Sequence, residues 1–503
     1  MKILPIEKVR QGDSYTIENE PISDIDLMER AAQALKEWFI SHISKDLIIK
    51  VFCGSGNNGG DGLALARLLN TSGYHVEACV LKSGQKLSPA CQVNYDRLFK
   101  KSGVRIYDLT EEDDFPEISG EDIVVDAIFG SGLSRPVKGF PAGLIRHINK
   151  NNAVVIAVDV PSGLFCDETN SQNPGAIIEA DVTLTFQFPK YAFLFAENFK
   201  YVGLWEVLPI GIHEDFIREV EVDNYLIELG DCRSIYKPRV KYAHKGHFGH
   251  ALLVAGSYGK MGAAVLASKA CLRAGAGLLT THIPVRGYSV LQTAVPEAMV
   301  SIDTSECAFS GMIELSNFNA IGVGPGIGTK EETQKALKLL IQGAETSLLF
   351  DADAINILAT NKTWLSFLPK HCIFTPHPKE FERLVGKSTS DFDRIQLQRE
   401  FSFRYQSYII LKGAHTSISC PDGRCYFNST GNPGMATGGS GDVLTGVILG
   451  LLAQYYHPKE ASILGVYLHG LAGDIAMEKR GMESMIASDI MDNLGEAFLR
   501  IRG

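Results

Sequence analysis

The hydrophobic positions in the first half of the chain follow two alternating patterns. Short apolar runs predict buried strands, and stretches with apolar residues three or four positions apart predict amphipathic helices. We therefore predict helices at about 24–40, from about residue 61, and at about 90–101, and strands at 47–53, 75–81, 122–130, 153–160, 183–188 and 203–210. Ser23 and Asp26 have the spacing of a capping box, so the first helix is expected to begin directly after Ser23.

The pattern breaks between about 212 and 242, in a charged stretch that we interpret as an irregular connection. A second series then begins, with a helix predicted at 261–274, further helices after Gly441, and strands at 250–257, 277–285, 319–328, 347–354, 371–378 and 407–416. Strands that alternate with helices form parallel sheets, which bind ligands at the carboxyl ends of their strands. The chain is therefore predicted to hold two α/β domains without a common repeat, at 1–212 and 241–503, joined by 213–240.

Size and composition agree with two folded domains. The 503 residues exceed what one core usually organises, and 45% hydrophobic with 21% charged residues is typical of globular proteins. The net charge of -10 disfavours nucleic acid as a partner. Because the chain has neither a signal-peptide pattern nor an apolar stretch of roughly 20 residues, we expect a soluble cytoplasmic protein without a membrane partner. The scattered cysteines are expected to be free thiols, and Cys420 and Cys425 to flank a hairpin turn.

A glycine-rich segment, CGSGNNGGDG at 53–62, follows the first predicted strand. Glycines let backbone amides approach a ligand closely, and the start of a helix favours negative charge. The segment therefore predicts contact with a phosphate-bearing ligand, and an ordinary strand-to-helix turn is the simpler alternative. It fits neither the dinucleotide fingerprint nor the P-loop pattern.

Carboxylates also stand near the ends of neighbouring predicted strands. Asp61 follows the first of them, Asp126 lies in VVDAIFG, and Asp159 lies in IAVDVPSG. Each of them alone is explained by a helix cap or a structural role. Together they predict one crevice suited to acid/base chemistry or to cation binding.

The most specific motif lies in the second half, where GGSGD at 438–442 leads into an apolar helix. Free amides at such a turn can hold an anion, and Asp442 is placed to take a proton from an attacking hydroxyl while phosphate charge develops beside it. Upstream, Lys412 follows a strand and suits a nucleotide's phosphates, and Glu380 is a candidate partner for hydrated magnesium. The structural alternatives are a surface cation for Lys412 and a helix-opening carboxylate for Glu380.

These motifs resemble bifunctional NAD(P)H-hydrate repair enzymes, in which an NAD(P)HX epimerase is fused to an ADP-dependent NAD(P)HX dehydratase. The resemblance covers nearly the whole chain, through NNGGDG, VDAIFGSGLSRP, VDVPSG and FPK in the first half and HKGHFG, GPGIG, DADAIN, TPHPKE, KGAHT and GGSGD in the second. It implies a Rossmann-like three-layer epimerase domain followed by a ribokinase-like dehydratase domain. His377 stands where sugar kinases of the ribokinase-like superfamily usually have Asn, which argues against a sugar substrate.

For the first domain the resemblance implies that Asp159 is the principal acid/base, with Lys190 beside it. A potassium ion is implied at Asn58, Asp126 and Ser162. The residues implied to contact the hydrated cofactor are Asn57, Asn58, Gly59, Gly60, Asp61, Gly130, Ser131, Gly132, Leu133, Ser134, Arg135, Pro136 and Asp159.

For the second domain the resemblance implies that Asp442 is the catalytic base, and magnesium is expected at Glu380 through water. The implied substrates are NADHX and NADPHX in their S form together with ADP, and the products are NAD(P)H, AMP and phosphate. The resemblance also suggests a homo-oligomer. Contacts with the hydrate are implied for Gly262, Gly326, His377 and Asp442, and contacts with the nucleotide for Lys412, Gly413, Ala414, His415, Thr416 and Gly441.

Two other functions fit parts of this pattern. A ribokinase-like kinase for a vitamin-precursor alcohol would prefer ATP and release a stable phosphorylated product. A non-catalytic first domain would be a binding module, but Asp126 and Asp159 argue against it, because a scaffold needs no acids at its strand ends.

Overall fold

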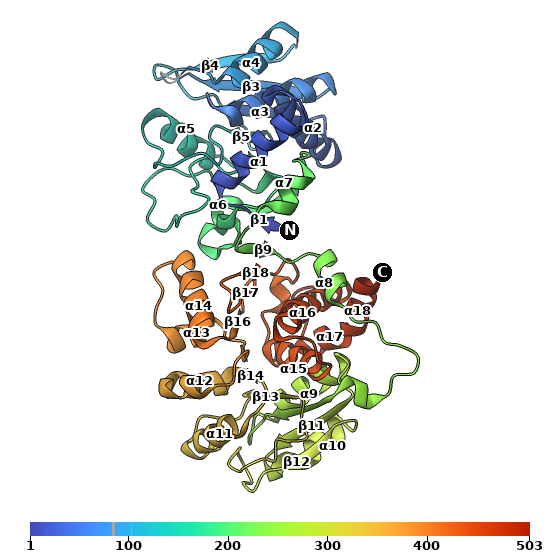
Figure 1. Cartoon of the computed structure of the whole chain (residues 1–503). Helices are drawn as coiled ribbons and strands as arrows, with labels where there is room; N and C mark the ends of the chain where they lie inside the picture. Colours follow the sequence, from blue (N-terminus) through green and yellow to red (C-terminus); the bar gives the residue numbers. More distant parts are fainter. Residues whose placement is uncertain (83–85, 102) are drawn as a thin grey trace. The chain divides into compact units, whose positions relative to one another are not determined.

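The computed structural model describes residues 1–82, 86–101 and 103–503, which divide into two compact units (Figure 1). The N-terminal unit comprises residues 2–222 and 390–392, and the C-terminal unit comprises residues 1, 223–389 and 393–503. Each unit has its own sheet, described separately below. No helix in the described part of the chain is long and apolar enough to cross a membrane.

The sheet of the N-terminal unit is entirely parallel, in the order β4–β3–β2–β5–β6–β7–β8. Its strands are β2 (Ile48–Cys53), β3 (His75–Leu81), β4 (Arg105–Leu109), β5 (Ile123–Ala127), β6 (Val154–Val158), β7 (Val182–Phe186) and β8 (Leu204–Leu208). The order reverses between β2 and β5, and at such a reversal a crevice opens beyond the carboxyl ends of the strands. The unit therefore has the expected Rossmann-like arrangement.

Helices cover both faces of this sheet, and one buried apolar cluster lies on each face. The helix predicted after Ser23 is confirmed, because the Ser23 hydroxyl accepts from the Asp26 amide at 3.2 Å and the Asp26 carboxylate accepts from the Ser23 amide at 3.0 Å. The helices are α1 (Ile6–Asn19), α2 (Asp24–His42), α3 (Asn57–Thr71), α4 (Pro89–Lys101), α5 (Gly139–Asn149), α6 (Phe199–Val202) and α7 (Glu214–Glu219), and a short strand β1 (Lys2–Ile3) precedes them.

The start of α3 differs from the prediction. We expected a glycine loop and a helix from about residue 61, but the helix begins at Asn57, so the glycines lie in its first turn. They are needed for close packing, because a Cβ on Gly59 would lie 1.9 Å from the Gly54 carbonyl oxygen and one on Gly60 would lie 2.7 Å from the sulfur of Met28. Glycine here therefore brings the helix against the preceding strand end and α2.

The main sheet of the C-terminal unit runs in the order β9–β18–β17–β16–β15–β14–β13–β10–β11–β12. It is parallel from β16 to β12, and β17 is antiparallel to β16 and to β18. The hairpin predicted around Cys420 is confirmed, since the Gly423 amide donates to its carbonyl oxygen at 3.0 Å. The strands are β9 (Asn224–Leu226), β10 (His250–Val254), β11 (Leu278–Ile283), β12 (Met299–Ile302), β13 (Ala320–Val323), β14 (Leu348–Phe350), β15 (Ile373–Phe374), β16 (Tyr408–Leu411), β17 (Ser417–Ser419) and β18 (Cys425–Phe427).

The apolar helix α15 after the GGSGD motif is buried and packs closely on α9. Glycines permit this approach, because a Cβ on Gly446 would lie 2.2 Å from the Ala267 carbonyl oxygen and one on Gly450 would lie 2.5 Å from that of Cys271. The helices of the unit are α8 (Leu229–Ile235), α9 (Met261–Arg273), α10 (Tyr288–Ala294), α11 (Glu331–Gly343), α12 (Ala352–Thr360), α13 (Pro378–Val385), α14 (Asp391–Tyr405), α15 (Ser440–Ala453), α16 (Pro458–Arg480), α17 (Ala487–Asp492) and α18 (Leu494–Arg502).

The stretch that we interpreted as irregular, 213–240, is ordered. It contains α7, β9 and α8, and β9 pairs in parallel with β18. These elements have three to seven residues each, too short for a periodic pattern to appear in the sequence. The prediction that this stretch is irregular was therefore wrong, although the boundary between the two units falls inside it.

Candidate functional site

The N-terminal unit contains a cavity of about 500 Å³ that reaches the carboxyl ends of β2, β5 and β6. It is lined in part by predicted site residues, namely Asn57, Asn58, Asp61, Gly130, Ser131, Gly132, Leu133, Asp159 and Lys190. The cavity wall does not include Gly59, Gly60, Asp126, Ser134, Arg135, Pro136 or Ser162. The structure thus brings together most of the residues proposed for this site and leaves the 134–136 segment outside the wall.

Asp159 and Lys190 form an ion pair in the cavity wall. The Lys190 side chain is 1% exposed, and its ammonium lies 2.8 Å from Oδ1 of Asp159. The same ammonium donates to the Thr185 hydroxyl at 2.8 Å and to the Phe188 carbonyl oxygen at 3.2 Å. Asp159 has φ of 63°, a left-handed conformation that side chains other than glycine rarely adopt and that is typical of functional positions.

The contacts to Asp159 converge on one of its two oxygens. Oδ1 accepts from the Thr185 hydroxyl at 3.2 Å and from the Phe186 amide at 3.3 Å, and the Lys190 ammonium also approaches it. Among the described residues, no such contact reaches Oδ2. The carboxylate is therefore held from one side and can use its second oxygen toward a ligand.

Two further carboxylates line the same cavity. Burial raises the pKa of Asp61 well above its ordinary value, and Asp159 and Asp13 raise it further. The pKa of Asp13 is raised to about 6, chiefly by burial and also by Asp159, while Lys190 opposes the change. The cavity therefore holds acidic groups that keep a proton closer to neutral pH than an ordinary aspartate does.

Sequence reasoning missed the contribution of α1. Val9, Arg10, Asp13 and Ile17 of this helix line the cavity. The Arg10 guanidinium lies close to the 130–136 segment, since a Cβ on Gly132 would be 2.8 Å from its Nη2. The sequence did hold a signal, since Arg10 and Asp13 are three positions apart and lie between the apolar residues Val9 and Ile17. We predicted no helix before residue 24, so this signal was not used.

The residues proposed for potassium lie close together, and one of them, Asn58, lines the cavity. Asp126 is fully buried, and its carboxylate accepts from the Ser162 amide at 2.7 Å and the Ser162 hydroxyl at 2.6 Å. The Asn58 amide group donates to the Phe129 carbonyl oxygen at 3.1 Å, and the Ser162 hydroxyl oxygen lies 3.1 Å from the same atom. Burial raises the pKa of Asp126 to about 6, although the hydrogen bonds from Ser162 oppose this change.

In the C-terminal unit, Asp351 is the centre of a buried polar cluster. It is 1% exposed, and its Oδ1 accepts from the Thr375 hydroxyl at 2.8 Å and lies 3.1 Å from the Lys412 ammonium. Its Oδ2 accepts from the Thr445 hydroxyl at 2.8 Å. Asp351 belongs to the DADAIN motif, but sequence reasoning gave it no role, because its partners come from three distant segments.

Asp442 lies in the first turn of α15, next to this cluster. Burial raises its pKa to about 7, Asp351 adds to this effect, and Lys412 opposes it. Gly441 also faces the cluster, since a Cβ on it would lie 3.3 Å from the Lys412 ammonium. The predicted base and the predicted phosphate-binding lysine therefore share one site, at a helix N-terminus that favours negative charge.

His377 and Glu380 form a capping box at the start of α13. The His377 amide donates to the Glu380 carboxylate at 2.9 Å, and Nδ1 of His377 accepts from the amides of Lys379 and Glu380 at 3.1 and 3.4 Å. Glu380 is 5% exposed, whereas the His377 side chain is 45% exposed. The structure thus shows Glu380 in a helix-opening role and leaves His377 open to a ligand.

The remaining predicted residues occupy several loops of the same unit. Gly326 has φ of 65°, and its carbonyl oxygen accepts from the Ser257 hydroxyl at 2.6 Å. Gly262 opens α9, where a Cβ would meet open space. The loop at 412–416 closes on itself, because the Thr416 hydroxyl donates to the Gly413 carbonyl oxygen at 3.1 Å. Within the same loop, Nδ1 of His415 lies 3.2 Å from the Asn428 carbonyl oxygen.

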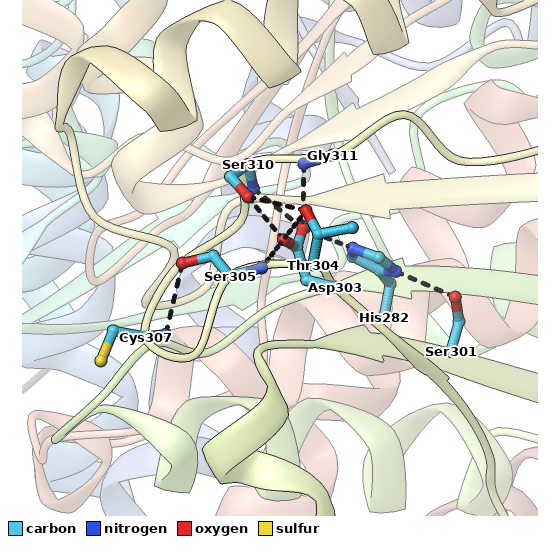
Figure 2. Close-up of polar contacts among 8 residues, drawn as sticks. All are labelled: His282, Ser301, Asp303, Thr304, Ser305, Cys307, Ser310 and Gly311. Carbon is cyan, nitrogen blue, oxygen red and sulfur yellow. Dashed lines mark hydrogen bonds and ion pairs between the residues drawn. The ribbon is translucent and has the colours of Figure 1, made fainter.

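A second buried polar network lies at the end of β11 and β12 (Figure 2). Nε2 of His282 lies 2.9 Å from the Asp303 carboxylate, and Nδ1 lies 2.9 Å from the Ser301 hydroxyl. Asp303 also accepts from the amides of Ser305 and Ser310 at 2.8 Å each, and these bonds hold its pKa low although burial opposes them. The network fixes the 303–311 segment and explains His282 as a structural residue.

Comparisons with known proteins agree with this geometry. Residues 251–495 match the family described as NAD(P)H-hydrate dehydratase, and residues 24–192 match the family described as YjeF-related protein N-terminus. A bifunctional NAD(P)H-hydrate repair enzyme from Moorella thermoacetica is 36% identical, over 98% of this chain and 96% of its own length. One from Escherichia coli is 31% identical, over 97% of this chain and 92% of its own length.

A solved structure is similar to the C-terminal unit. It is an ADP/ATP-dependent NAD(P)H-hydrate dehydratase from Bacillus subtilis, co-crystallised with ATP and Mg²⁺, with a TM-score of 0.50 and 31% sequence identity. The match covers 55% of this chain and 98% of that one. The C-terminal unit therefore has the ribokinase-like α/β fold that the motifs implied.

Proposed function

The chain belongs to the family of bifunctional NAD(P)H-hydrate repair enzymes, and we propose that it repairs hydrated NADH and NADPH with two separate sites. In this proposal the N-terminal unit epimerises NAD(P)HX at C6. The C-terminal unit dehydrates the S epimer with ADP and releases NAD(P)H, AMP and phosphate. The observation that carries the proposal is Asp442, with a pKa raised to about 7, beside the Asp351–Lys412 pair at the start of α15.

The dehydratase chemistry follows from what must leave the ring. Hydroxide is a poor leaving group, so the C6 hydroxyl is first converted to a phosphate ester by transfer from ADP. Asp442 takes the hydroxyl proton as the oxygen attacks phosphorus, and AMP departs. The ring nitrogen then expels the phosphate to give an iminium ion, and loss of a proton from C5 restores the C5–C6 double bond of the reduced cofactor. A base with a pKa near the working pH is suited to such a step, and it contributes typically 10²–10⁴-fold.

Lys412 supplies positive charge to the same step. Its ammonium is paired with Asp351 and lies near the backbone of Gly441, which places it beside the amides of the α15 N-terminus. A lysine with helix amides stabilises charge that develops on a transferred phosphoryl group. We propose that the 412–416 loop and Gly441 hold the nucleotide, and that Gly262, Gly326 and His377 contact the hydrate.

In the N-terminal unit we propose that Asp159 is the principal acid/base. Lys190 holds it through Oδ1, which leaves Oδ2 available to a ligand in the cavity that Asp159 lines. Arg10 is proposed to meet a phosphate of the hydrated dinucleotide, because its guanidinium lies beside Gly132 in the cavity wall. A guanidinium suits this task through bidentate hydrogen bonds.

Potassium fits the residues proposed for it. Asp126 is buried, no described lysine, arginine or histidine pairs with it, and Asn58 and Ser162 add neutral oxygens nearby. A bound monovalent cation would compensate the buried carboxylate. Magnesium at Glu380 fits less well, because this carboxylate is already engaged in the cap of α13. We propose that magnesium accompanies the nucleotide phosphates.

The direct test supplies the purified protein with both epimers of NADHX, ADP and magnesium. The absorbance of regenerated NADH is followed, and AMP and phosphate are measured. We expect complete recovery with one AMP and one phosphate per NADH. Recovery of only one epimer would reduce the N-terminal unit to a binding role. No recovery, combined with ATP-dependent phosphorylation of a small alcohol, would favour a vitamin-precursor kinase.

A further inference from the structure

The first helix presents one face to the N-terminal cavity. Val9, Arg10, Asp13 and Ile17 line the cavity, and residues three and four positions apart lie on the same side of a helix. Arg10 has a role in the proposal above, and Val9 and Ile17 are apolar. A carboxylate between apolar neighbours needs a partner or a function, because burying a charge without one is costly.

In the part of the chain that the structure describes, Asp13 has no such partner. Among the described residues, none donates a hydrogen bond to its carboxylate, and its pKa is raised to about 6 by burial and by the neighbouring Asp159. The charged groups that line the same cavity are Arg10, Asp24, Asp61, Asp159 and Lys190. Asp13 can therefore carry a proton at mildly acidic to neutral pH and present it to a ligand in the cavity.

Asp159 is held in the opposite way. It is fixed from one side by the Lys190 ammonium and by the Thr185 hydroxyl. Asp159 lines the cavity together with Asp13, and its negative charge helps to raise the pKa of Asp13. One cavity thus contains an aspartate of α1 whose pKa is raised to about 6 and an aspartate after β6 that Lys190 and Thr185 hold through a single oxygen.

We propose that Asp13 is a second catalytic residue of the epimerase and acts as the acid opposite Asp159. This inference rests on the proposed epimerase function. As the ring nitrogen's lone pair forms a double bond to C6, the C6–O bond breaks, and Asp13 gives its proton to the departing hydroxyl, which leaves as water. A second water attacks C6 from the other face while Asp159 takes its proton. The electron pair returns to nitrogen, and the two carboxyl groups exchange roles in the reverse direction.

The first test compares Asp13→Asn with the wild type in the full-length chain. Asparagine keeps the shape and can donate a hydrogen bond, but it cannot transfer a proton. We expect epimerase kcat to fall by roughly 10²-fold or more, with little change in KM. Glu18→Gln is the matched control, since Glu18 is an exposed acid on the same helix, and it should leave kcat unchanged. Asp13→Glu should restore part of the lost rate.

The pH profile separates a proton donor from a structural residue. Because the acid form of Asp13 is needed, wild-type kcat/KM for epimerisation should fall as the pH rises above about 6. That decline should be absent from the residual activity of Asp13→Asn. A purely structural Asp13 would lower the rate equally at every pH.

Oxygen exchange tests the chemistry. In ¹⁸O-labelled water the proposed route places one labelled oxygen at C6 for each enzymatic inversion, after subtraction of the reaction without enzyme. Retention of the original oxygen would show that the ring opens instead, and it would overturn the inference. If the wild type epimerises and Asp13→Asn does so equally at all pH values, the inference alone fails. If the wild type does not epimerise, the proposed function fails with it.

Discussion

Replacing Lys190 by methionine tests the central contact of the N-terminal site. Methionine has a similar length and no charge, so the substitution removes the ammonium and preserves most of the volume. Four oxygens lose the ammonium as a partner at once, on Asp159, Thr185, Phe186 and Phe188, at distances of 2.8, 2.8, 3.4 and 3.2 Å. The Lys190 side chain is 1% exposed, so little water can replace it.

The expected decrease in the free energy of unfolding follows from this burial. Removing one partner of a buried ion pair typically costs about 3–5 kcal/mol, because the other charge stays behind uncompensated. The Asp159 side chain is 14% exposed, so water reaches part of it, which places the expected loss near the lower end, at about 3 kcal/mol. Without Lys190 the Asp159 carboxylate loses the contact that positions it, so epimerase kcat should also fall by roughly 10²-fold.

The stability assay can be confined to one unit. Trp38 and Trp205 lie in the N-terminal unit and Trp364 in the other, so a Trp364→Phe background makes tryptophan fluorescence report on the N-terminal unit during urea unfolding. Lys200→Met is the control, because Lys200 is 62% exposed and lies 3.9 Å from its partner, so its loss should cost less than about 1 kcal/mol. Equal stability and equal epimerase activity in the wild type and Lys190→Met would refute this account.

Further predictions concern both units. Asp442→Asn should lower dehydration by roughly 10²–10⁴-fold and leave epimerisation unchanged, measured with separated epimers. Wild-type dehydration should decline as the pH falls through about 7, since the base is then protonated; a flat profile between pH 6 and 8 would exclude Asp442 as the base. Gly59→Ala should destabilise the N-terminal unit in urea by about 1–3 kcal/mol or more, because its Cβ would meet the Gly54 carbonyl oxygen, whereas Gly56→Ala meets nothing and should be neutral.

Much of the fold could be predicted because its central strands are continuous apolar runs. Both faces of these parallel strands are covered, so a run such as 251–254 has no polar interruption. β4 and β12 lack this feature, because they lie at the edges of their sheets and are only partly buried. The start of α3 was missed for another reason: its glycines reflect contacts with Gly54 and Met28, which no local pattern reveals.

The candidate site residues also differ in whether local sequence or distant segments place them. Asp442 could be named from the sequence, because the glycine turn and the helix that place it are local. Asp351 could not be given a role, because it acts through Thr375, Lys412 and Thr445, which come from separate segments. Asp13 was missed likewise, since only the folded chain brings α1 to the strand ends that carry the other acids.

Two unrelated sheets in this chain arrive at the same electrostatic arrangement. In the C-terminal unit a lysine-paired carboxylate, Asp351 with Lys412, stands beside Asp442, whose pKa is raised to about 7. In the N-terminal unit the pair of Asp159 and Lys190 stands beside Asp13 of α1, whose pKa is raised to about 6. The paired carboxylate adds negative charge next to its neighbour, and burial prevents water from screening it. A carboxyl group whose pKa is higher in the folded state than in the unfolded state lowers stability once the pH exceeds the unfolded value.

For Asp442 this loss of stability develops as the pH rises from 3.8, its ordinary pKa, to about 7. One pKa unit corresponds to about 1.36 kcal/mol, so the loss above that range amounts to roughly 4 kcal/mol. Asparagine at the same position cannot ionise and avoids the penalty. The same substitution that removes the base should therefore make the C-terminal unit more stable at pH 8 and have little effect at pH 4. A site that keeps the pKa of a carboxylic acid near neutral pH therefore lowers the stability of the unit that holds it.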